Sequence, residues 1–236
     1  MKHELVITKD GSHTVALANM GVTYHSLHGA IQESQHVFIE AGLNYFLDRN
    51  PQEQTRILEV GFGTGLNALL SLIVSEQKHR ALHYTAIDLY PLDTDFINSL
   101  NYTTILNRPD LVETFAKMHI AEWEKEISVN SNFVLHKKKL AANQAKEGTF
   151  DLIYFDAFAP GFQPELWTEE VFKGIYSRLS GNGLLVTYCS KGSARRAMQA
   201  AGFSVEKLAG PKGKREMVRA HHSMVQLIAP SFSSLT

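Results

Sequence analysis

The sequence predicts an α/β fold built on a mostly parallel sheet, and three observations support this prediction. From about residue 55 onward, short runs rich in β-branched and aromatic residues alternate with longer stretches compatible with helices. The first of these strands leads directly into a glycine-rich turn and then a helix. Two late strands around one loop would add a single antiparallel strand near the C-terminus.

In the first half of the predicted core, strands and helices alternate. We expect strands at Thr55–Val60, His83–Ile87 and Asn132–His136, and helices at Leu66–Glu76, Leu92–Leu106 and Asp110–Ile127. Pro91 and Pro109 precede the last two helices, because proline is tolerated at the start of a helix and not inside it.

The second half continues the alternation and ends in the two late strands. The expected order is strand Phe150–Phe155, loop Ala157–Pro164, helix Glu165–Leu179, strand Leu184–Cys189, helix Ser193–Ala201, and strands Ser204–Leu208 and Glu216–Ala220. Gly202 suits the residue that follows a helix, because it tolerates a left-handed conformation.

The first 54 residues do not follow this pattern. Asp10-Gly11 is a turn signal between Leu5–Asp10 and Thr14–Ala18, which predicts a hairpin. His25–Leu47 resembles an irregular loop that leads into a helix. We therefore expect residues 1–54 to form an N-terminal extension packed on the core, and residues 55–236 to form the main domain.

Composition excludes several classes of protein. No apolar run is long enough for a membrane span, and the N-terminus lacks the apolar segment of a secretory signal. Cys189 is the single cysteine, so no internal disulfide forms, and the histidines are too scattered to predict a metal site. These features predict a cytoplasmic protein with no metal.

Charge is distributed unevenly along the chain. The formal net charge is -1, but residues 190–221 hold eight Lys and Arg against two Glu, a net of +6. The remainder therefore carries about −7. A basic segment on an acidic protein suits a selective anionic partner, and it is also compatible with a merely solvated surface.

The segment EVGFGTGLN, which begins at Glu59 and ends at Asn67, is the most informative motif. A strand that runs into closely spaced glycines lets the backbone approach a ligand. A dinucleotide site needs the spacing G-x-G-x-x-G, whereas Gly61, Gly63 and Gly65 give G-x-G-x-G. Glu59 suits a cofactor with an ammonium group, and Phe62 belongs to the same loop, so the motif predicts S-adenosylmethionine.

Two carboxylates follow later strands of the predicted sheet. Asp88 ends the second strand, where it can accept hydrogen bonds from ribose hydroxyls; NAD sites use the same feature. Asp156 ends the strand FDLIYF and opens the segment DAFAP, where it could hold a substrate amine and accept its proton. Phe158, Phe162 and Trp167 could exclude water or stack on a base.

In combination, EVGFGTGLN, DAFAP, SARRAMQAAGF and GKREM resemble the methyltransferase domain of the MnmC family, also called MnmD. The resemblance covers about Tyr24 to Ala220. It implies a Rossmann-like class I S-adenosylmethionine methyltransferase fold. It also implies methylation of the 5-aminomethyl group on the wobble (2-thio)uridine of tRNA, giving 5-methylaminomethyl-(2-thio)uridine.

The resemblance also assigns residues to roles. The cofactor contacts would be Gly61, Gly63, Gly65 and Asn67, with Asp88 on the ribose and Asp156 at the reaction centre. Lys212, Lys214 and Arg215 would face the anticodon region of tRNA. Independently of the resemblance, the position of DAFAP at a strand end leads us to expect Phe158 and Pro160 to contact the substrate.

Two departures from the family pattern matter. The chain stops at Thr236, where bifunctional members continue into a flavin-dependent domain; the resemblance thus implies no FAD and a separate enzyme that supplies the aminomethyl precursor. The family's acidic residue after the third strand is missing from residues 135–141, LHKKKLA, so the adenine contact stays unassigned.

Three other functions remain open at this stage. They are a methyltransferase or aminopropyltransferase-like enzyme acting on a small amine, a noncatalytic cofactor- or RNA-binding module, and an NAD enzyme.

Overall fold

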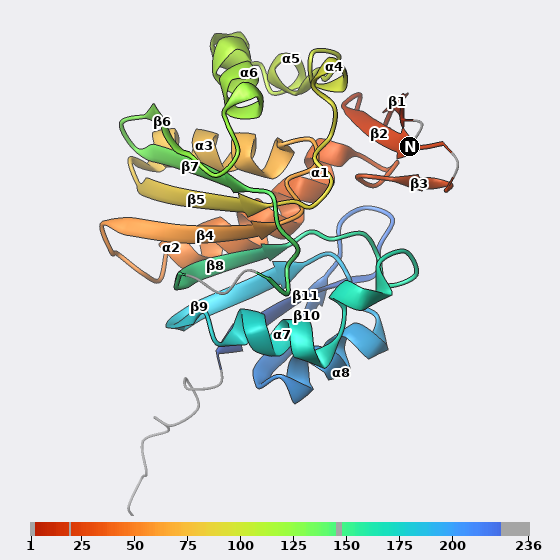
Figure 1. Ribbon diagram of the computed structural model, residues 1–236, viewed down its shortest axis with the longest axis vertical. Helices are drawn as coiled ribbons and strands as arrows, with labels where there is room; N and C mark the ends of the chain where they lie inside the picture. Colours follow the sequence, from red (N-terminus) through yellow and green to blue (C-terminus); the bar gives the residue numbers. More distant parts are fainter. Residues whose placement is uncertain (1–2, 19, 145–147, 223–236) are drawn as a thin grey trace, which may run out of the picture.

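The computed structural model describes residues 3–18, 20–144 and 148–222, and it shows a central eight-stranded sheet (Figure 1). The strand order is β10-β11-β9-β8-β4-β5-β7-β6. The five central strands are mutually parallel. β11 is antiparallel to both neighbours, as predicted for a late strand. The last fourteen residues of the predicted domain 55–236 lie outside the described residues.

The elements have the following bounds. The strands are β1 His3–Ile7, β2 His13–Leu17, β3 Val22–Thr23, β4 Gln54–Val60, β5 Ala81–Ile87, β6 Glu126–Asn130, β7 Phe133–Lys138, β8 Phe150–Phe155, β9 Leu179–Thr187, β10 Phe203–Ala209 and β11 Glu216–His222. The helices are α1 Ala30–Ser34, the π-helix η1 Gln35–Asn44, α2 Tyr45–Leu47, α3 Leu66–Lys78, α4 Thr94–Ile97, α5 Tyr102–Ile105, the 3₁₀-helix η2 Pro109–Leu111, α6 Val112–Ile120, the 3₁₀-helix η3 Pro164–Leu166, α7 Glu169–Tyr176 and α8 Gly192–Ala200.

The predicted core strands are confirmed within a few residues, and so are the predicted helices Leu66–Glu76 and Ser193–Ala201. The other three predicted helices are wrong in extent. The expected helix Leu92–Leu106 is two short helices, α4 and α5, and the chain between them contains Asn101. The side chain of Asn101 accepts from the amide of His13 and donates to the carbonyl of Gly11. This tertiary contact with the N-terminal hairpin interrupts the helix.

The expected helix Asp110–Ile127 ends early, because α6 stops at Ile120 and the chain then forms β6. Ile127 pairs with Leu135 across the antiparallel β6–β7 ladder, which gives the sheet a second antiparallel strand at the opposite edge. The expected helix Glu165–Leu179 is also shorter. The hydroxyl of Thr168 accepts from the amide of Val171 and caps the start of α7.

Alternation along β8 divides the core into two layers. Leu152 and Tyr154 pack with α3, α6 and the α1–η1 segment, whereas Ile153 and Phe155 pack with α7 and α8. All four side chains are fully buried. The chain therefore forms an α/β/α arrangement, and Figure 1 shows α7 and α8 on the side of the sheet opposite α3.

The N-terminal segment forms a small three-stranded sheet, β1-β2-β3, followed by the continuous helical stretch α1–η1–α2. β1 and β2 form the predicted hairpin, and β3 was not predicted. Within η1, a Cβ added to Gly42 would lie 2.9 Å from a methyl group of Val186, so glycine lets η1 approach β9 closely. The small sheet lies beyond the carboxyl ends of the central strands (Figure 1).

The register of the parallel strands brings the predicted motif residues to one edge of the sheet. Val60 pairs with both Ile87 and Phe155, so the strands β4, β5 and β8 end side by side. Gly61 and Asp156 continue the ladder with hydrogen bonds of 2.9 and 3.0 Å to the ends of neighbouring strands. In the part of the chain that the structure describes, no helix is long and apolar enough to cross a membrane.

Candidate active site

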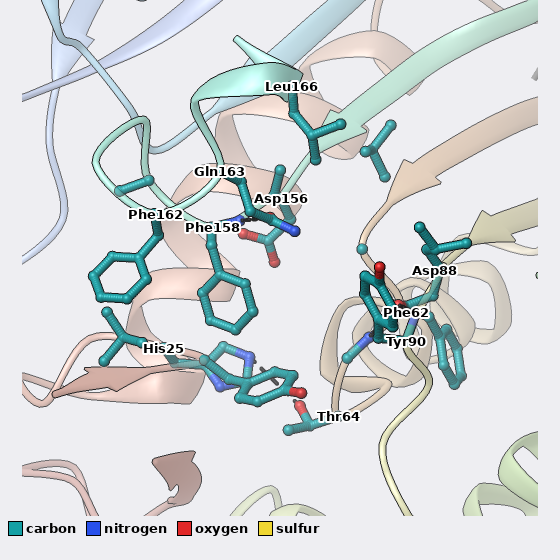
Figure 2. A pocket seen from close by; sticks show the side chains of 18 of the residues that line it. His25, Phe62, Thr64, Asp88, Tyr90, Asp156, Phe158, Phe162, Gln163 and Leu166 are labelled. Atoms are coloured by element: carbon teal, nitrogen blue, oxygen red, sulfur yellow. Dashed lines mark hydrogen bonds between the residues drawn. The ribbon is translucent and has the colours of Figure 1, made fainter. Parts of the chain in front are cut away.

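A cavity of about 1000 Å³ opens at the carboxyl ends of β4, β5 and β8. This is the edge at which ligands bind in open α/β sheets. One wall contains Asp156, Phe158 and Phe162, and the facing wall contains the glycine loop, Asp88 and Tyr90 (Figure 2). Residues of β2 and β3 close the cavity from the N-terminal side.

The glycine loop is held in conformations that only glycine adopts easily. Gly61, Gly63 and Gly65 have φ values of 93°, 50° and 71°. A Cβ on Gly61 would lie 2.8 Å from the carbonyl oxygen of Asp156, and one on Gly65 would lie 2.7 Å from the ring of His119. Side chains are therefore excluded on both sides of the loop, and its backbone stays exposed to the cavity at Gly61 and Gly63.

Asp88 connects the end of β5 to this loop. Its carboxylate accepts hydrogen bonds from the amides of Gly63 and Tyr90, at 3.0 and 2.9 Å. Burial raises the pKa of Asp88, and the hydrogen bonds from backbone amides oppose the increase. The carboxylate also lines the cavity, where its remaining acceptor capacity is available to a ligand.

Asn67 links two carboxylates beneath and beside the loop. Its Nδ2 donates to Glu59 Oε1 at 2.9 Å and to Asp156 Oδ2 at 2.8 Å. Glu59 is 1% exposed and lies outside the cavity lining, so it holds Asn67 from below and does not face a ligand directly. Glu59 Oε2 and Asn67 Oδ1 are buried and accept no hydrogen bond from a described residue.

Asp156 has an unusual electrostatic environment for a carboxylate. Burial raises its pKa well above the ordinary value, and the negative charge of Glu33 raises it further. The hydrogen bond from Asn67 and the positive charge of Lys214 act in the opposite direction. A carboxylate with a raised pKa is suited to accept a proton near neutral pH.

The loop after Asp156 is fixed by hydrogen bonds to its backbone. Phe158 donates its amide to Gln163 Oε1 at 3.0 Å and accepts from the indole of Trp167 at 2.8 Å. Trp167 packs against Phe155 and lies outside the cavity lining, so its predicted role against the substrate is wrong and it serves the core. Phe158 and Phe162 do line the cavity.

Aromatic and basic side chains support the glycine loop from behind. The ring of Phe62 packs on the ring of His119, with 5.2 Å between centroids, and lies 5.4 Å from the ammonium of Lys137. Lys137 is 1% exposed and donates to the carbonyl of His119. Burial lowers the pKa of Lys137 to about 8 and that of His119 to about 3.

The N-terminal segment contributes two residues that the sequence did not reveal. The ring of Tyr24 packs edge-on against Phe158, with 5.0 Å between centroids. It also lies against the position that a Cβ on Gly63 would occupy. His25 is 8% exposed and lies within 3.1 Å of the hydroxyl of Thr14. Both residues line the cavity, and burial lowers the pKa of His25 to about 4.

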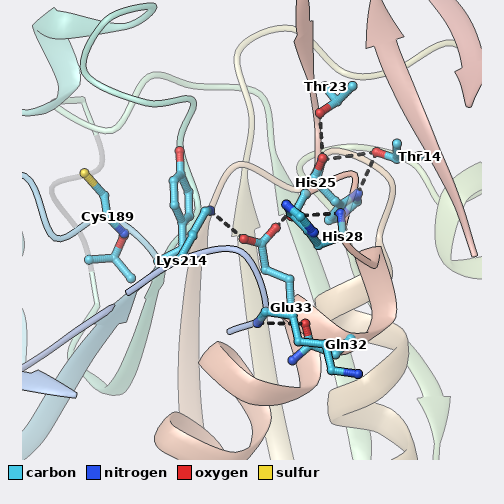
Figure 3. Close-up of polar contacts among 12 residues, drawn as sticks. Thr14, Thr23, His25, His28, Gln32, Glu33, Cys189 and Lys214 are labelled. Atoms are coloured by element: carbon cyan, nitrogen blue, oxygen red, sulfur yellow. Dashed lines mark hydrogen bonds and ion pairs between the residues drawn. The ribbon is translucent and has the colours of Figure 1, made fainter. Parts of the chain in front are cut away.

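Two further missed residues, Glu33 and Tyr188, contact the predicted residue Lys214. The ammonium of Lys214 lies 2.5 Å from Glu33 Oε1, which is on α1, and 3.8 Å from the ring centroid of Tyr188 (Figure 3). Tyr188 could have been suspected, because it follows a parallel strand at the edge where ligands bind. Glu33 belongs to a segment with family resemblance, and nothing local indicates its partner.

The basic segment does not form one exposed face. Arg219 is buried and pairs with Glu206, while Lys207 pairs with Glu216 across β10 and β11. Lys214 lines the cavity instead of lying at the surface with its neighbours. The exposed basic side chains of this segment without an ion pair to a described residue are Lys191, Arg196, Lys212 and Arg215.

The predicted site residues therefore fall into two sets. Those that line the cavity are Gly61, Phe62, Gly63, Asn67, Asp88, Asp156, Phe158 and Lys214. Those that do not are Glu59, Gly65, Pro160, Lys212 and Arg215. Among the described residues, no cluster of His, Cys, Asp or Glu has the arrangement needed to hold a metal ion.

The loop after β7 supplies the wall next to Asp88. Residues 139–143 line the cavity, and this stretch contains no carboxylate. Leu140, Ala141 and Ala142 offer an apolar surface, and Asn143 is the amide at its end. A mainly apolar surface beside Asp88 has the chemistry that suits an adenine ring.

Comparison with known proteins agrees with this geometry. Residues 108–223 match the model of a family described as S-adenosyl-L-methionine-dependent methyltransferase. The chain is 30% identical over 237 residues to the tRNA 5-methylaminomethyl-2-thiouridine biosynthesis bifunctional protein MnmC of Burkholderia thailandensis, which covers 91% of this chain and 34% of that protein. The protein of the same name from Magnetococcus marinus is 32% identical over 212 residues, which covers 84% of this chain and 31% of that protein.

The fold comparison gives the same result. The crystal structure of MNMC2 from Aquifex aeolicus is similar with a TM-score of 0.75 and 26% sequence identity, covering 93% of this chain and 70% of that chain. Together these matches support an S-adenosyl-L-methionine-dependent methyltransferase. Within that class, its resemblance to the methyltransferase domain of the MnmC family is confirmed. The chain spans about a third of the length of the curated relatives it matches.

The residues present fit S-adenosylmethionine. The loop leaves backbone exposed at Gly61 and Gly63, where a Cβ would meet Asp156 or Tyr24. Asp88 offers acceptors for ribose hydroxyls, and Asp156 and Asn67 offer a carboxylate and an amide near the loop. An NAD enzyme is not supported, because the spacing of the glycines and the family match both favour S-adenosylmethionine.

Proposed function

We propose that this protein transfers a methyl group to the 5-aminomethyl nitrogen of the wobble (2-thio)uridine in tRNA, giving 5-methylaminomethyl-(2-thio)uridine. The observation that carries the proposal is Asp156, a carboxylate with a raised pKa beside the glycine loop, in a cavity large enough for a nucleoside and a cofactor. The names of the MnmC relatives supply the substrate class.

S-adenosylmethionine supplies an electrophilic methyl group on a sulfonium. Gly61, Gly63 and Asn67 would hold its amino-acid part, Asp88 its ribose, and the surface at Leu140–Asn143 its adenine. An amine nitrogen attacks only when its lone pair is free, so the substrate ammonium must lose a proton. Asp156 would attract the ammonium and accept that proton, which leaves the nitrogen with a free lone pair before it attacks the methyl group.

The aromatic side chains near Asp156 would hold the base. Phe158 and Tyr24 form adjoining faces in the cavity, and Phe162 lies at its margin. Such rings stack on unpaired bases with little regard to sequence. A wobble base rotated out of the anticodon loop would therefore reach Asp156 between Phe158 and the glycine loop.

Exposed basic residues near the margin of the cavity at Phe162 would contact the anticodon region of the tRNA. Lys191 reaches within 4.0 Å of the Cβ position of Gly161, next to Phe162, which places the start of α8 beside the cavity. Lys212 and Arg215 lie on the loop that carries Lys214. Contacts of this kind bind phosphates and make affinity depend on salt.

Three further proposals complete this assignment. Residues 1–54 act as an N-terminal extension that covers one side of the cavity, and residues 55–236 are the methyltransferase domain. The protein works in the cytoplasm, where its tRNA substrate is found. A separate enzyme supplies the aminomethyl precursor.

The test compares two tRNA preparations, one with the aminomethyl precursor and one without, each incubated with the protein and labelled S-adenosylmethionine. The proposal predicts label only in the first tRNA. Label in neither tRNA, with folded protein that binds the cofactor, would contradict it. Free small amines form a third arm, because rapid methylation of these would favour the small-amine alternative. Cofactor binding without any transfer would favour a noncatalytic module.

A further inference from the structure

The cavity contains a second carboxylate and an ammonium that the reaction as described does not use. Glu33 is 5% exposed, and its two oxygens accept from the ammonium of Lys214 and from the amide of Ser26, the latter at 2.7 Å. Glu33 and Lys214 are 181 positions apart and face the same space as Asp156. Figure 3 shows Lys214 reaching across to Glu33 on its helix.

The loop that carries Lys214 is held against α1 by further contacts. The amide of Lys212 donates to Gln32 Oε1 at 3.3 Å, and His36 Nε2 lies 2.8 Å from the carbonyl of Ala209. The ammonium of Lys214 lies over the face of Tyr188, whose hydroxyl donates to the carbonyl of Ala157. Because Ala157 follows Asp156, this chain of contacts fixes the ammonium relative to the carboxylate.

We propose that Glu33 and Lys214 are positioning residues for methyl transfer, whose ion pair neutralises Glu33 and leaves Asp156 as the carboxylate that receives the substrate amine. The proposal rests on the proposed amine methylation. Asp156 Oδ2 accepts from Asn67, whereas Oδ1 accepts from no described residue. The amine can therefore bind Asp156 Oδ1, and it is not diverted to Glu33, whose oxygens already accept from Lys214 and Ser26.

The electrostatic consequence follows from the signs of the charges. Glu33 raises the pKa of Asp156, and Lys214 lowers it. The other titratable groups that face these residues are Glu59 from β4, Tyr84 from β5, Tyr188 after β9, Cys189 beside it, and His25 from the N-terminal segment. Lys214 also places a positive charge near the substrate ammonium, which favours the loss of its proton.

The experiment measures single-turnover methyl transfer against pH for the wild type, Lys214→Met, Glu33→Gln and the double variant. Methionine keeps a long unbranched side chain without the charge, and glutamine keeps an acceptor for the amide of Ser26. We expect the acidic limb of the rate profile to move to higher pH in Lys214→Met, by about one unit or more, and to lower pH in Glu33→Gln. The double variant should lie between the two.

Lys212→Met is the matched control, since this side chain is exposed on the same loop. It should change the salt dependence of tRNA affinity and leave the acidic limb in place. If Lys214→Met behaves like Lys212→Met, Lys214 is a phosphate contact and the proposal is overturned. A shift of both single variants in the same direction would also overturn it.

A second measurement separates this proposal from the proposed function. The carboxyl carbon of Asp156 is titrated by carbon-13 NMR without tRNA, and its signal is assigned from its loss in Asp156→Asn. Opposite shifts of the midpoint in Lys214→Met and Glu33→Gln support the ion-pair role even if no tRNA is methylated. Unchanged midpoints in both variants overturn the role even if methylation proceeds.

Discussion

The glycine-loop wall of the cavity and the wall made by Glu33, Tyr188 and Lys214 differ in how their residues are spaced along the chain. The first wall comes from one short segment and the ends of neighbouring strands, and its backbone is held by hydrogen bonds to Asp88 and to the neighbouring strand. The second wall depends on side chains that come from both ends of the sequence. The surface proposed for the cofactor is thus encoded locally, and the surface proposed for the substrate depends on tertiary contacts.

The largest expected effect comes from Asp156, where the two walls meet. Asp156→Asn keeps a partner for Asn67 and removes the proton acceptor. We expect methyl transfer to fall by about 100-fold or more, with the affinity for S-adenosylmethionine changed little. Rapid-quench kinetics and calorimetry measure the two quantities separately. Equal losses in both would mean that the two walls do not act independently.

The next effect tests the backbone wall alone. Gly61→Ala introduces a Cβ that meets the carbonyl of Asp156, at a φ of 93° that costs roughly 1–2 kcal/mol for other residues. We expect the Kd for the cofactor to rise by about tenfold or more, together with a lower Tm. Gly174→Ala is the control, because Gly174 lies exposed in α7 with open space around its Cβ position, and alanine should stabilise the helix there. A Gly61→Ala protein with unchanged cofactor affinity would contradict this account of the loop.

A third test addresses the N-terminal segment, which covers one side of the cavity. His25 is buried, and its pKa is lowered to about 4 in the folded protein. The unfolded chain therefore binds a proton below about pH 6.5 that the folded chain does not, so stability falls as pH decreases from 6.5 to 4. The loss attributable to His25 is about 3 kcal/mol at the acidic end.

Urea unfolding at several pH values checks this prediction. His25→Gln should flatten the acidic decrease in stability, because glutamine has no proton to gain. The exposed His79→Asn should leave the decrease as it is in the wild type. If both variants lose stability in acid as the wild type does, the burial of His25 does not contribute to the pH dependence.

The smallest effect concerns the exposed basic residues. Lys212→Ala and Arg215→Ala should each weaken tRNA binding a few-fold and lower the slope of affinity against salt by about one. Filter binding at several salt concentrations measures both quantities. Slopes equal to that of the wild type would remove these residues from the tRNA contact.

The difference between the walls also explains what the sequence could predict. The central strands were predictable because their apolar residues and boundary glycines are local signals, and Asp88 and Asp156 follow directly from strand ends. The break at Asn101 and the strand at Ile127 depend on distant partners, His13 and Leu135, so no local pattern reveals them.

Within the site, too, residues placed by a local motif were easier to predict than residues placed by distant partners. The positions of Gly61 and Asn67 follow from one motif, whereas Lys214 looked like a surface cation because its partner is 181 residues away. The basic segment was predicted from a sum of charges, which cannot show that Arg219 is buried or that Lys207 is paired. Charge counts describe a segment, and only the fold assigns its members to the surface or the cavity.

In the proposed reaction, Asp156 and the glycine loop together direct methylation to the aminomethyl nitrogen of the wobble uridine. The most direct measurement incubates precursor tRNA with S-adenosylmethionine that carries a trideuterated methyl group, and then fragments the isolated nucleoside in a mass spectrometer. The account predicts that the deuterated methyl group is found on the exocyclic amine of that nucleoside. Label on the ring, on the ribose or on another nucleoside would contradict it.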